Sequence, residues 1–167
     1  MTHIISAFPG LGKTTIFTLN KDTIFDREFN ESRSIQGMTS EGQTSFFQHC
    51  ADMVQLQKKT GYYNYLFITD HPALVERLKT KSITHIYPNV FQTEVMAEYK
   101  QRLIKRSGLE WYERVMPPKI SHLKAHIQQL YDCDCDVRLT DLEHRYIEDV
   151  FEFKPHIKLP KDIERIK

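Results

Sequence analysis

The chain has 167 residues, of which 23 are Lys or Arg and 22 are Asp or Glu, so its net charge at pH 7 is only +1. This balance argues against a general polyanion binder, whose affinity would rest on excess positive charge. A chain of this length fits one domain, here residues 1–167, and can bury a core without disulfides or a structural metal.

The sequence lacks the marks of a membrane or secreted protein. It has no apolar run as long as the roughly 18 residues that a transmembrane helix needs. No basic segment followed by a long apolar stretch stands at its start. Its three cysteines, Cys50, Cys133 and Cys135, are too few for a disulfide framework. We therefore expect a cytoplasmic protein with no membrane partner.

Five short apolar segments are predicted to be strands. They alternate with longer segments of helical periodicity, and each ends at polar or turn-forming residues. The predicted strands are residues 3–8, 23–25, 65–68, 83–87 and 135–139.

Start and stop signals place the helices between these strands. Pro72 predicts one helix start, and pairs with capping-box spacing predict two more. A Ser-Gly pair is predicted to end a long helix, and a Pro-Pro pair to separate the next two. These signals are Ser40 with Gln43, Thr140 with Glu143, residues 107–108 and residues 117–118.

The alternation of strands and helices predicts an α/β fold. Successive βαβ units would build a single-domain, mainly parallel five-stranded sheet with helices on both faces. Ligands of such sheets bind beyond the carboxyl ends of the strands. The last segment, residues 151–167, has two prolines and mixed charge, and we expect it to be a tail that packs loosely or contacts a partner.

One segment carries a specific chemical signal. It matches the phosphate-binding pattern G-x-x-x-x-G-K-[ST], with Ala7 in place of the first glycine, and it stands between a predicted strand and a predicted helix. Its residues are Ala7-Phe8-Pro9-Gly10-Leu11-Gly12-Lys13-Thr14-Thr15.

The residue types of this segment suit the binding of a polyphosphate. Gly10 and Gly12 would let backbone N–H groups approach a polyphosphate. Lys13 would place its ammonium on the β- and γ-phosphates, and the Thr14 hydroxyl would bind Mg²⁺. We therefore expect residues Pro9 to Thr15 to bind a nucleoside triphosphate, with Lys13 as a catalytic residue.

Asp70 is a candidate second ligand of Mg²⁺. It follows four apolar residues, where a carboxylate would hold the metal directly or through water. The alternative is that Asp70 caps the helix that starts at Pro72, and the two roles can coexist.

Asp26 is a candidate catalytic base. It ends the second predicted strand, where its carboxylate could take a proton from an acceptor hydroxyl. Glu28 is a rival for this role, and Arg33 could bind an acceptor phosphate. The alternative is that this polar stretch is simply a solvated loop.

Arg102, Lys105 and Arg106 concentrate positive charge at the end of one predicted helix. In a kinase, such arginines can close over the triphosphate and neutralise the charge that develops during transfer. The alternative is a structural role, since Glu98 and Arg102 have ion-pair spacing and cations suit a helix C-terminus.

The phosphate-binding pattern, together with several segments that follow it in a fixed order, resembles the small P-loop proteins of tailed bacteriophages that are similar to nucleoside monophosphate kinases. The resemblance implies a kinase-type P-loop fold, ATP and Mg²⁺, and a helical lid over residues 89–131 that carries Arg102 and Arg106. It spans most of residues 2–150 and rests on Ala7-Phe8-Pro9-Gly10-Leu11-Gly12-Lys13-Thr14, Asp26, Tyr65-Leu66-Phe67-Ile68-Thr69, Ile86-Tyr87-Pro88, Glu98-Tyr99-Lys100-Gln101-Arg102 and Lys105-Arg106-Ser107-Gly108.

The function we expect first is Mg²⁺- and ATP-dependent phosphoryl transfer to a (deoxy)nucleoside monophosphate or a related nucleotide. A second hypothesis is a hydroxyl acceptor, such as a nucleoside or a hydroxymethylated base in DNA, which would gain from Asp26 as base. Only in that case would DNA be a partner. A hypothesis from another class is an ATP-binding regulator without transferase activity.

Overall fold

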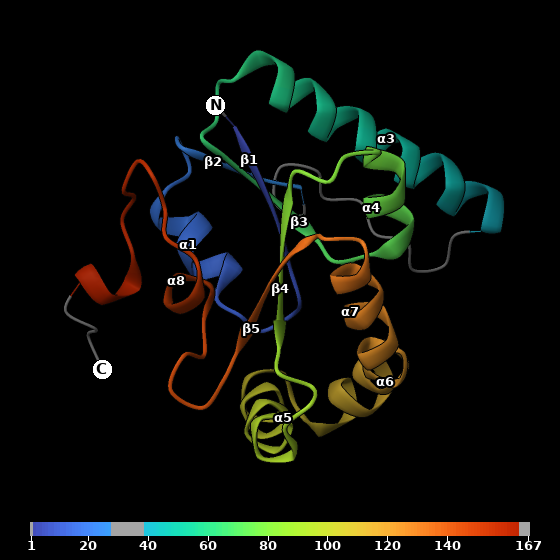
Figure 1. Cartoon of the computed structure of the whole chain (residues 1–167), viewed down its shortest axis with the longest axis vertical. Helices are drawn as coiled ribbons and strands as arrows, with labels where there is room; N and C mark the ends of the chain where they lie inside the picture. Colours follow the sequence, from blue (N-terminus) through green and yellow to red (C-terminus); the bar gives the residue numbers. More distant parts are fainter. Residues whose placement is uncertain (1, 28–38, 164–167) are drawn as a thin grey trace.

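The computed structural model describes residues 2–27 and 39–163 and shows an α/β fold built on one parallel sheet (Figure 1). Its strands lie in the order β2-β3-β1-β4-β5, and every neighbouring pair is parallel. All five predicted strands are confirmed, with shifts of about one residue at their ends. They are β1 (His3–Ala7), β2 (Ile24–Asp26), β3 (Tyr65–Thr69), β4 (Ile83–Pro88) and β5 (Asp136–Thr140).

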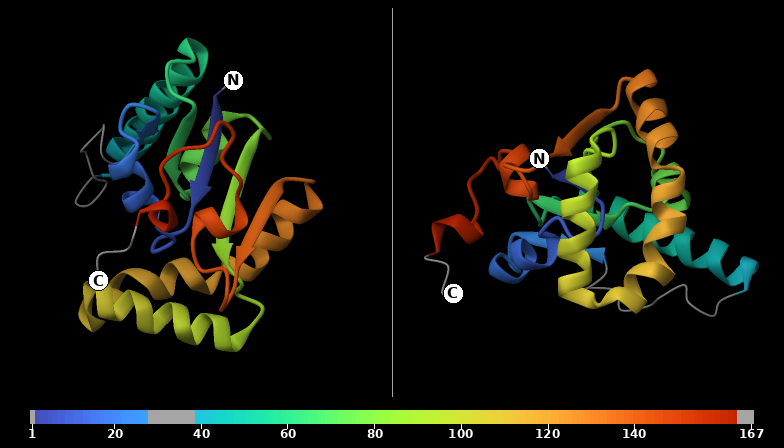
Figure 2. Two further views of the ribbon diagram at one scale, coloured as in Figure 1. Left: turned by 90° about the vertical axis from the view of Figure 1, so that its left-hand side faces the viewer. Right: turned by 90° about the horizontal axis from the view of Figure 1, so that it is seen from below.

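Helices cover both faces of the sheet and the end toward which the strands point. Helices α1 and α8 lie on one side and α3, α4 and α7 on the other, while α5 and α6 lie across the carboxyl ends (Figures 1 and 2). Within the described residues, no helix is long and apolar enough to cross a membrane. The bounds are α1 (Lys13–Leu19), α3 (Ser40–Thr60), α4 (Pro72–Leu78), α5 (Thr93–Ser107), α6 (Leu109–Ser121), α7 (Leu123–Asp132), α8 (Ile147–Val150) and a 3₁₀ turn, η1 (Pro160–Asp162).

The residues of strand β1 are apolar on both faces because both faces of the sheet are covered. Successive side chains of a strand point to opposite sides of the sheet. Ile4 accordingly packs in the core with residues of α3 and α4, and Ile5 packs in the core with residues of α1 and α5. Both side chains are fully buried, as expected for the centre of a parallel sheet.

The strand order places the phosphate-loop segment at a favourable position. β1 lies between β3 and β4, and the chain leaves β1 toward β2 at one edge but leaves β4 toward β5 at the other. Where neighbouring strands connect in opposite directions, a crevice opens at their carboxyl ends. The segment after Ala7 starts in this crevice.

Two predicted helix caps are shifted by one residue. The side chain that caps α3 belongs to Thr39, not Ser40, and it accepts a hydrogen bond from the Gly42 N–H at 3.1 Å. The cap of α4 is His71, whose Nδ1 accepts from the Ala73 N–H at 3.3 Å. The alternative role of Asp70 as this cap was therefore wrong.

The predicted helix start at Thr140 was also wrong. Thr140 is the last residue of β5 and pairs with Pro88, so its backbone is committed to the sheet. The chain then turns at Asp141, whose Oδ1 accepts from the backbone N–H groups of Glu143 and His144. Helix α8 begins only after this turn, at residue 147.

The proline pair lies inside α6 instead of ending it. Pro117 and Pro118 each remove a helical N–H donor. Both are exposed, as are Glu113 and Arg114 one turn earlier, so water can satisfy the freed carbonyls. The break between α6 and α7 falls later, at His122.

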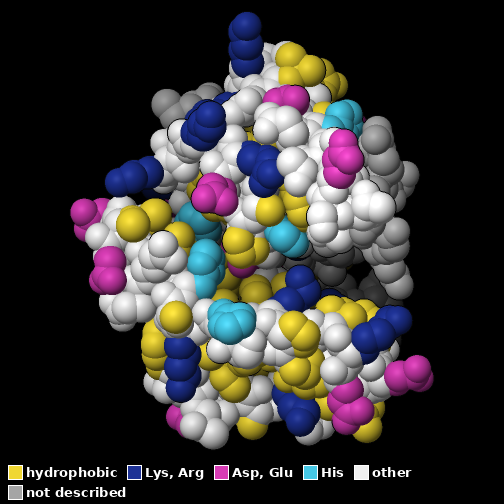
Figure 3. Space-filling view, turned by 90° about the vertical axis from the view of Figure 1, so that its right-hand side faces the viewer, with side chains coloured by type: hydrophobic (Ala, Val, Ile, Leu, Met, Phe, Trp, Pro, Cys, Tyr) yellow, Lys and Arg dark blue, Asp and Glu magenta, His cyan; other side chains and the backbone are white. Residues whose placement is uncertain are grey.

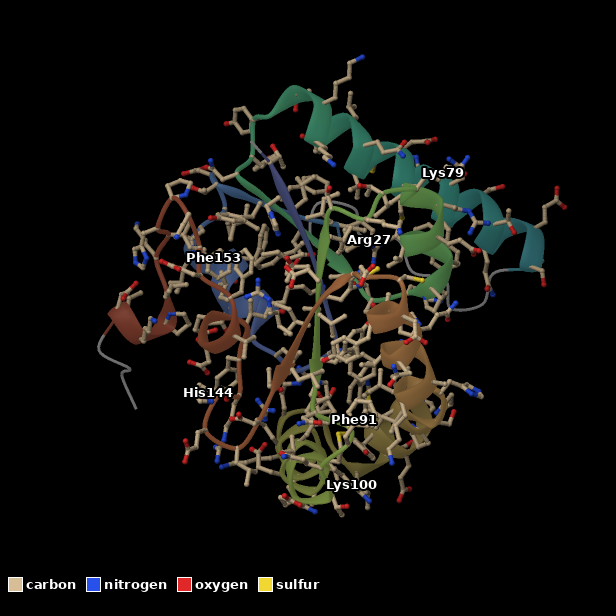
Figure 4. All side chains as sticks on the ribbon, viewed as in Figure 1. Arg27, Lys79, Phe91, Lys100, His144 and Phe153 are labelled. Carbon is tan, nitrogen blue, oxygen red and sulfur yellow. The ribbon has the colours of Figure 1, made fainter. Side chains whose placement is uncertain are left out.

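The C-terminal segment is part of the core, which corrects the expectation of a loosely packed tail. The Phe153 ring packs against Tyr65 on the α1 side of the sheet (Figure 4). The Asn20 side chain donates to the Lys158 carbonyl at 2.7 Å and accepts from the Lys158 N–H at 2.8 Å. The described residues from 151 to 163 are thus fastened to the end of α1.

Replacing Leu66 by Ala should destabilise the fold, because this side chain of β3 is fully buried. The expected loss in free energy of unfolding is about 2–5 kcal/mol. Leu56→Ala is the matched control, since Leu56 is 56% exposed and its removal should cost less than about 0.5 kcal/mol. Urea unfolding measures both, and equal losses would contradict the sheet assignment.

Candidate functional site

The loop between β1 and α1 needs its two glycines. Gly10 has φ of 80° and Gly12 has φ of 91°, values that L side chains rarely adopt. A Cβ on Gly10 would lie 2.5 Å from Leu103 Cδ2, and one on Gly12 would lie 3.3 Å from Tyr146 Cδ1. The backbone conformation therefore disfavours any side chain at both positions, and at Gly10 a Cβ would also clash with Leu103.

Three successive carbonyl groups of the loop accept hydrogen bonds from the surrounding protein. The Tyr99 hydroxyl donates to the Pro9 carbonyl at 2.6 Å, and Arg102 Nη1 donates to the Gly10 carbonyl at 3.4 Å. The Ile147 N–H donates to the Leu11 carbonyl at 3.0 Å. With its carbonyls held by α5 and α8, the loop offers mainly N–H groups to a ligand, as an anion-binding nest does.

Tyr99 is suited to hold the loop permanently. Burial raises the pKa of its hydroxyl well above the usual value. The hydroxyl therefore stays protonated and remains a donor to the Pro9 carbonyl across the physiological pH range.

The structure explains why alanine is tolerated at the first position of the motif. Ala7 is the last residue of β1 and pairs with Thr69 on one side and Ile86 on the other. It has regular strand backbone and a buried side chain. The tight turn that a glycine would ease begins only after Phe8.

The loop forms one wall of a cavity of about 790 Å³. Among the described residues, the side chains that line it include four cations, Lys13, Arg102, Arg106 and Lys119, and no carboxylate. The loop, Arg102 and Arg106 thus line one cavity, whereas Lys105 does not line it. The other lining residues are Ala7, Phe8, Pro9, Gly10, Gly12, Thr14, Thr15, Thr69, Trp111, Val115 and Tyr146.

The two arginines differ in how firmly they are held. The Arg102 guanidinium lies 5.0 Å from the centre of the Tyr146 ring and 5.7 Å from that of Tyr99. Its Nε is 3.5 Å from Glu98, so the predicted ion pair is also present. Arg106 is exposed and stacks at 5.5 Å over Trp111. Arg102 therefore braces the loop, whereas Arg106 is the more adaptable cation.

Asp26 lies next to the loop lysine. Its Oδ1 is 3.9 Å from Lys13 Nζ, and its side chain is completely buried. The end of β2 thus brings a carboxylate to the glycine loop, as the sequence suggested. Its role as a base stays a prediction, as do the functions of the other candidate residues.

Asp70 does not line the cavity around the loop. It lines a neighbouring cavity, and its Oδ1 accepts hydrogen bonds from Ser6 Oγ at 3.0 Å and from the Tyr87 hydroxyl at 2.7 Å. The role of Asp70 in binding Mg²⁺ also stays a prediction. The candidates Glu28 and Arg33 lie outside the described residues.

Two residues that line the cavity, Lys119 and Tyr146, were not predicted from the sequence. Lys119 follows the proline pair of α6, where the sequence predicted a break and not a continuous helix. Tyr146 lies in the turn after β5, more than a hundred residues from the loop that it contacts. No local pattern marks either position.

No protein-family model matches this chain, and no curated protein is similar to it in sequence.

Replacing Gly10 by Ala should distort the loop. The new methyl group would collide with Leu103, which is buried and cannot move aside freely. Gly61→Ala is the matched control, because Gly61 also has positive φ but nothing lies within 4 Å of the added methyl. We expect a larger drop in melting temperature for Gly10→Ala, and a similar drop for both would show that only backbone strain matters.

Proposed function

We propose that this protein is a phosphotransferase that uses Mg²⁺-bound ATP as donor and a (deoxy)nucleoside monophosphate or related nucleotide as acceptor. The observation that carries the proposal is a cavity whose described lining residues include four cations and no carboxylate, beside a glycine loop whose carbonyls are held by the protein. Such a site favours a polyanion of the size of a triphosphate.

The donor phosphates would lie along the loop. The N–H groups of residues Gly10 to Thr15 and the Lys13 ammonium are the groups that can hold their oxygens. The Thr14 side chain is exposed to the cavity and supplies a hydroxyl for Mg²⁺. A bound metal would neutralise phosphate charge during transfer.

The helices of the predicted lid supply the remaining cations. Arg106 from α5 and Lys119 from α6 line the cavity without an ion pair to any described carboxylate. Charge that spreads over the transferred phosphoryl group is stabilised by such prepositioned cations.

Two features support a phosphate acceptor. Asp26 is completely buried with its Oδ1 3.9 Å from Lys13 Nζ, which favours a role as partner of the lysine over a role as base. An acceptor phosphate is already anionic and needs cations, which the cavity offers, whereas a hydroxyl would need a base.

Lys13→Ala should abolish phosphoryl transfer while the fold is retained. We expect a loss of about 100-fold or more in the rate of transfer from γ-labelled ATP to a panel of nucleoside monophosphates, because the lysine compensates charge at the reacting phosphates. Lys21→Ala is the control, since Lys21 is exposed and does not line the cavity.

The same assay distinguishes the other hypotheses. ATP binding without labelled product would favour a regulator, and labelled nucleosides or modified DNA would favour a hydroxyl acceptor. Full transfer by Lys13→Ala would refute the proposed site.

Arg106→Ala should lower kcat at least about tenfold and leave the melting temperature nearly unchanged, because Arg106 is exposed and faces the cavity. Lys105→Ala, one residue earlier, removes a cation that does not line the cavity. Steady-state kinetics of both variants separate a local effect of Arg106 from a general effect of positive charge on α5. Equal losses in the two would count against the assignment.

A further inference from the structure

A second cavity, of about 480 Å³, adjoins the cavity around the glycine loop, which we call the phosphate cavity. Phe8 and Lys119 line both, so the two spaces meet at these side chains. Figure 3 views the molecule from the side of α4, α6 and α7 and shows a hollow bordered by histidine, lysine and arginine side chains. We call the second space the Asp70 cavity.

The Asp70 cavity differs in chemistry from the phosphate cavity. Lys119, at the shared boundary, is the one lysine or arginine among the lining residues that the structure describes. Its walls combine apolar surface from Phe8, Pro72, Pro118 and Leu123 with hydrogen-bonding groups from Asp70, His71, His126 and Gln129. Apolar walls with a few fixed polar groups are typical of sites for small, uncharged ring systems.

Hydrogen bonds to one of its carboxylate oxygens hold the Asp70 side chain in one orientation. Its Oδ1 accepts from Ser6 and from Tyr87, and the Tyr87 oxygen in turn lies 3.1 Å from His126 Nε2. No described residue donates to Asp70 Oδ2, which leaves this oxygen as the acceptor that Asp70 offers to a ligand.

His71 supplies the complementary donor. Its Nδ1 accepts from the Ala73 N–H, so the proton of the neutral ring is on Nε2. The ring also packs at 4.2 Å against Phe47, which fixes its plane. A carboxylate acceptor and an imidazole donor thus stand on adjacent residues.

We propose that the Asp70 cavity binds the nucleobase of the acceptor nucleotide, with Asp70 Oδ2 accepting from a base N–H and His71 donating to a neighbouring base oxygen or nitrogen. The edges of nucleobases carry such donors and acceptors side by side. This assignment rests on the proposed function, since it makes the occupant of the cavity the phosphate acceptor. Lys119, at the boundary, then faces the acceptor phosphate.

Asp70→Asn is a sharp test because the amide has nearly the same shape. The amide oxygen can keep the bonds from Ser6 and Tyr87, and the NH₂ group then takes the place of Oδ2. The substitution therefore turns an acceptor into a donor at one position of the cavity. Asp52→Asn, on the exposed face of α3, is the matched control.

The probes are the four 2′-deoxynucleosides, which have a base but no phosphate, and binding is measured by NMR titration without ATP. We expect wild-type protein and Asp52→Asn to bind at least one of them equally well. Asp70→Asn should weaken that binding about tenfold or more and change the order of preference, because a hydrogen bond to a charged group is lost. No binding by wild type, or equal binding by Asp70→Asn, would overturn the assignment.

A second variant covers the case in which Asp70→Asn does not fold. His71→Asn can retain the cap of α4, since Asn is a good capping residue, while it removes the imidazole from the cavity. The same loss of nucleoside binding is expected. Unchanged binding by His71→Asn would overturn the assignment.

Failure of this inference is distinguishable from failure of the proposed function. Nucleoside binding that depends on Asp70, without transfer from ATP, would refute the kinase proposal and keep a nucleoside site. Phosphoryl transfer that Asp70→Asn lowers equally for every acceptor, with nucleoside binding intact, would instead assign Asp70 to the metal and refute the nucleobase site.

Discussion

The hydrogen bonds that hold the carbonyls of Pro9, Gly10 and Leu11 are the constraint on which the site depends. A glycine-rich loop is flexible by itself, and its carbonyls would repel phosphate as strongly as its N–H groups attract it. Donors from α5 and from the start of α8 remove this conflict because they occupy the carbonyls. The loop is therefore organised by distant segments, and the glycines only permit the conformation that these segments impose.

The same residues connect binding to the helices that supply the lid cations. Arg102 bonds the loop, lies against Tyr146 and pairs with Glu98 on its own helix. A shift of α5 would therefore move both the loop and the turn after β5. Arg106, which stacks on Trp111 of α6, can respond to a ligand without disturbing these contacts. The contacts therefore make the glycine loop the more rigid part of the cavity and Arg106 of α5 the more adaptable one.

The strands, the sheet and the loop could be predicted because their signals are local: apolar runs that stop at turns, and one spaced motif. The caps of α3 and α4 were missed by one residue because Thr39 and His71 compete with adjacent polar residues for the same role. The helix break predicted at Pro117 and Pro118 was wrong because the free-energy cost of a proline inside a helix depends on solvent exposure. The sequence does not show that exposure. Lys119 and Tyr146 could not be found at all, since only tertiary packing brings them to the loop.

The bond between Asn20 and Lys158, which are 138 residues apart, has a consequence for synthesis on the ribosome. During synthesis the glycine loop is made before α5 and Ile147, which hold its carbonyls, and Asn20 is made before its partner Lys158. A nascent chain therefore carries the glycine loop before the segments that organise it exist. A ligand of this loop would stabilise the chain only after these segments have been made and packed.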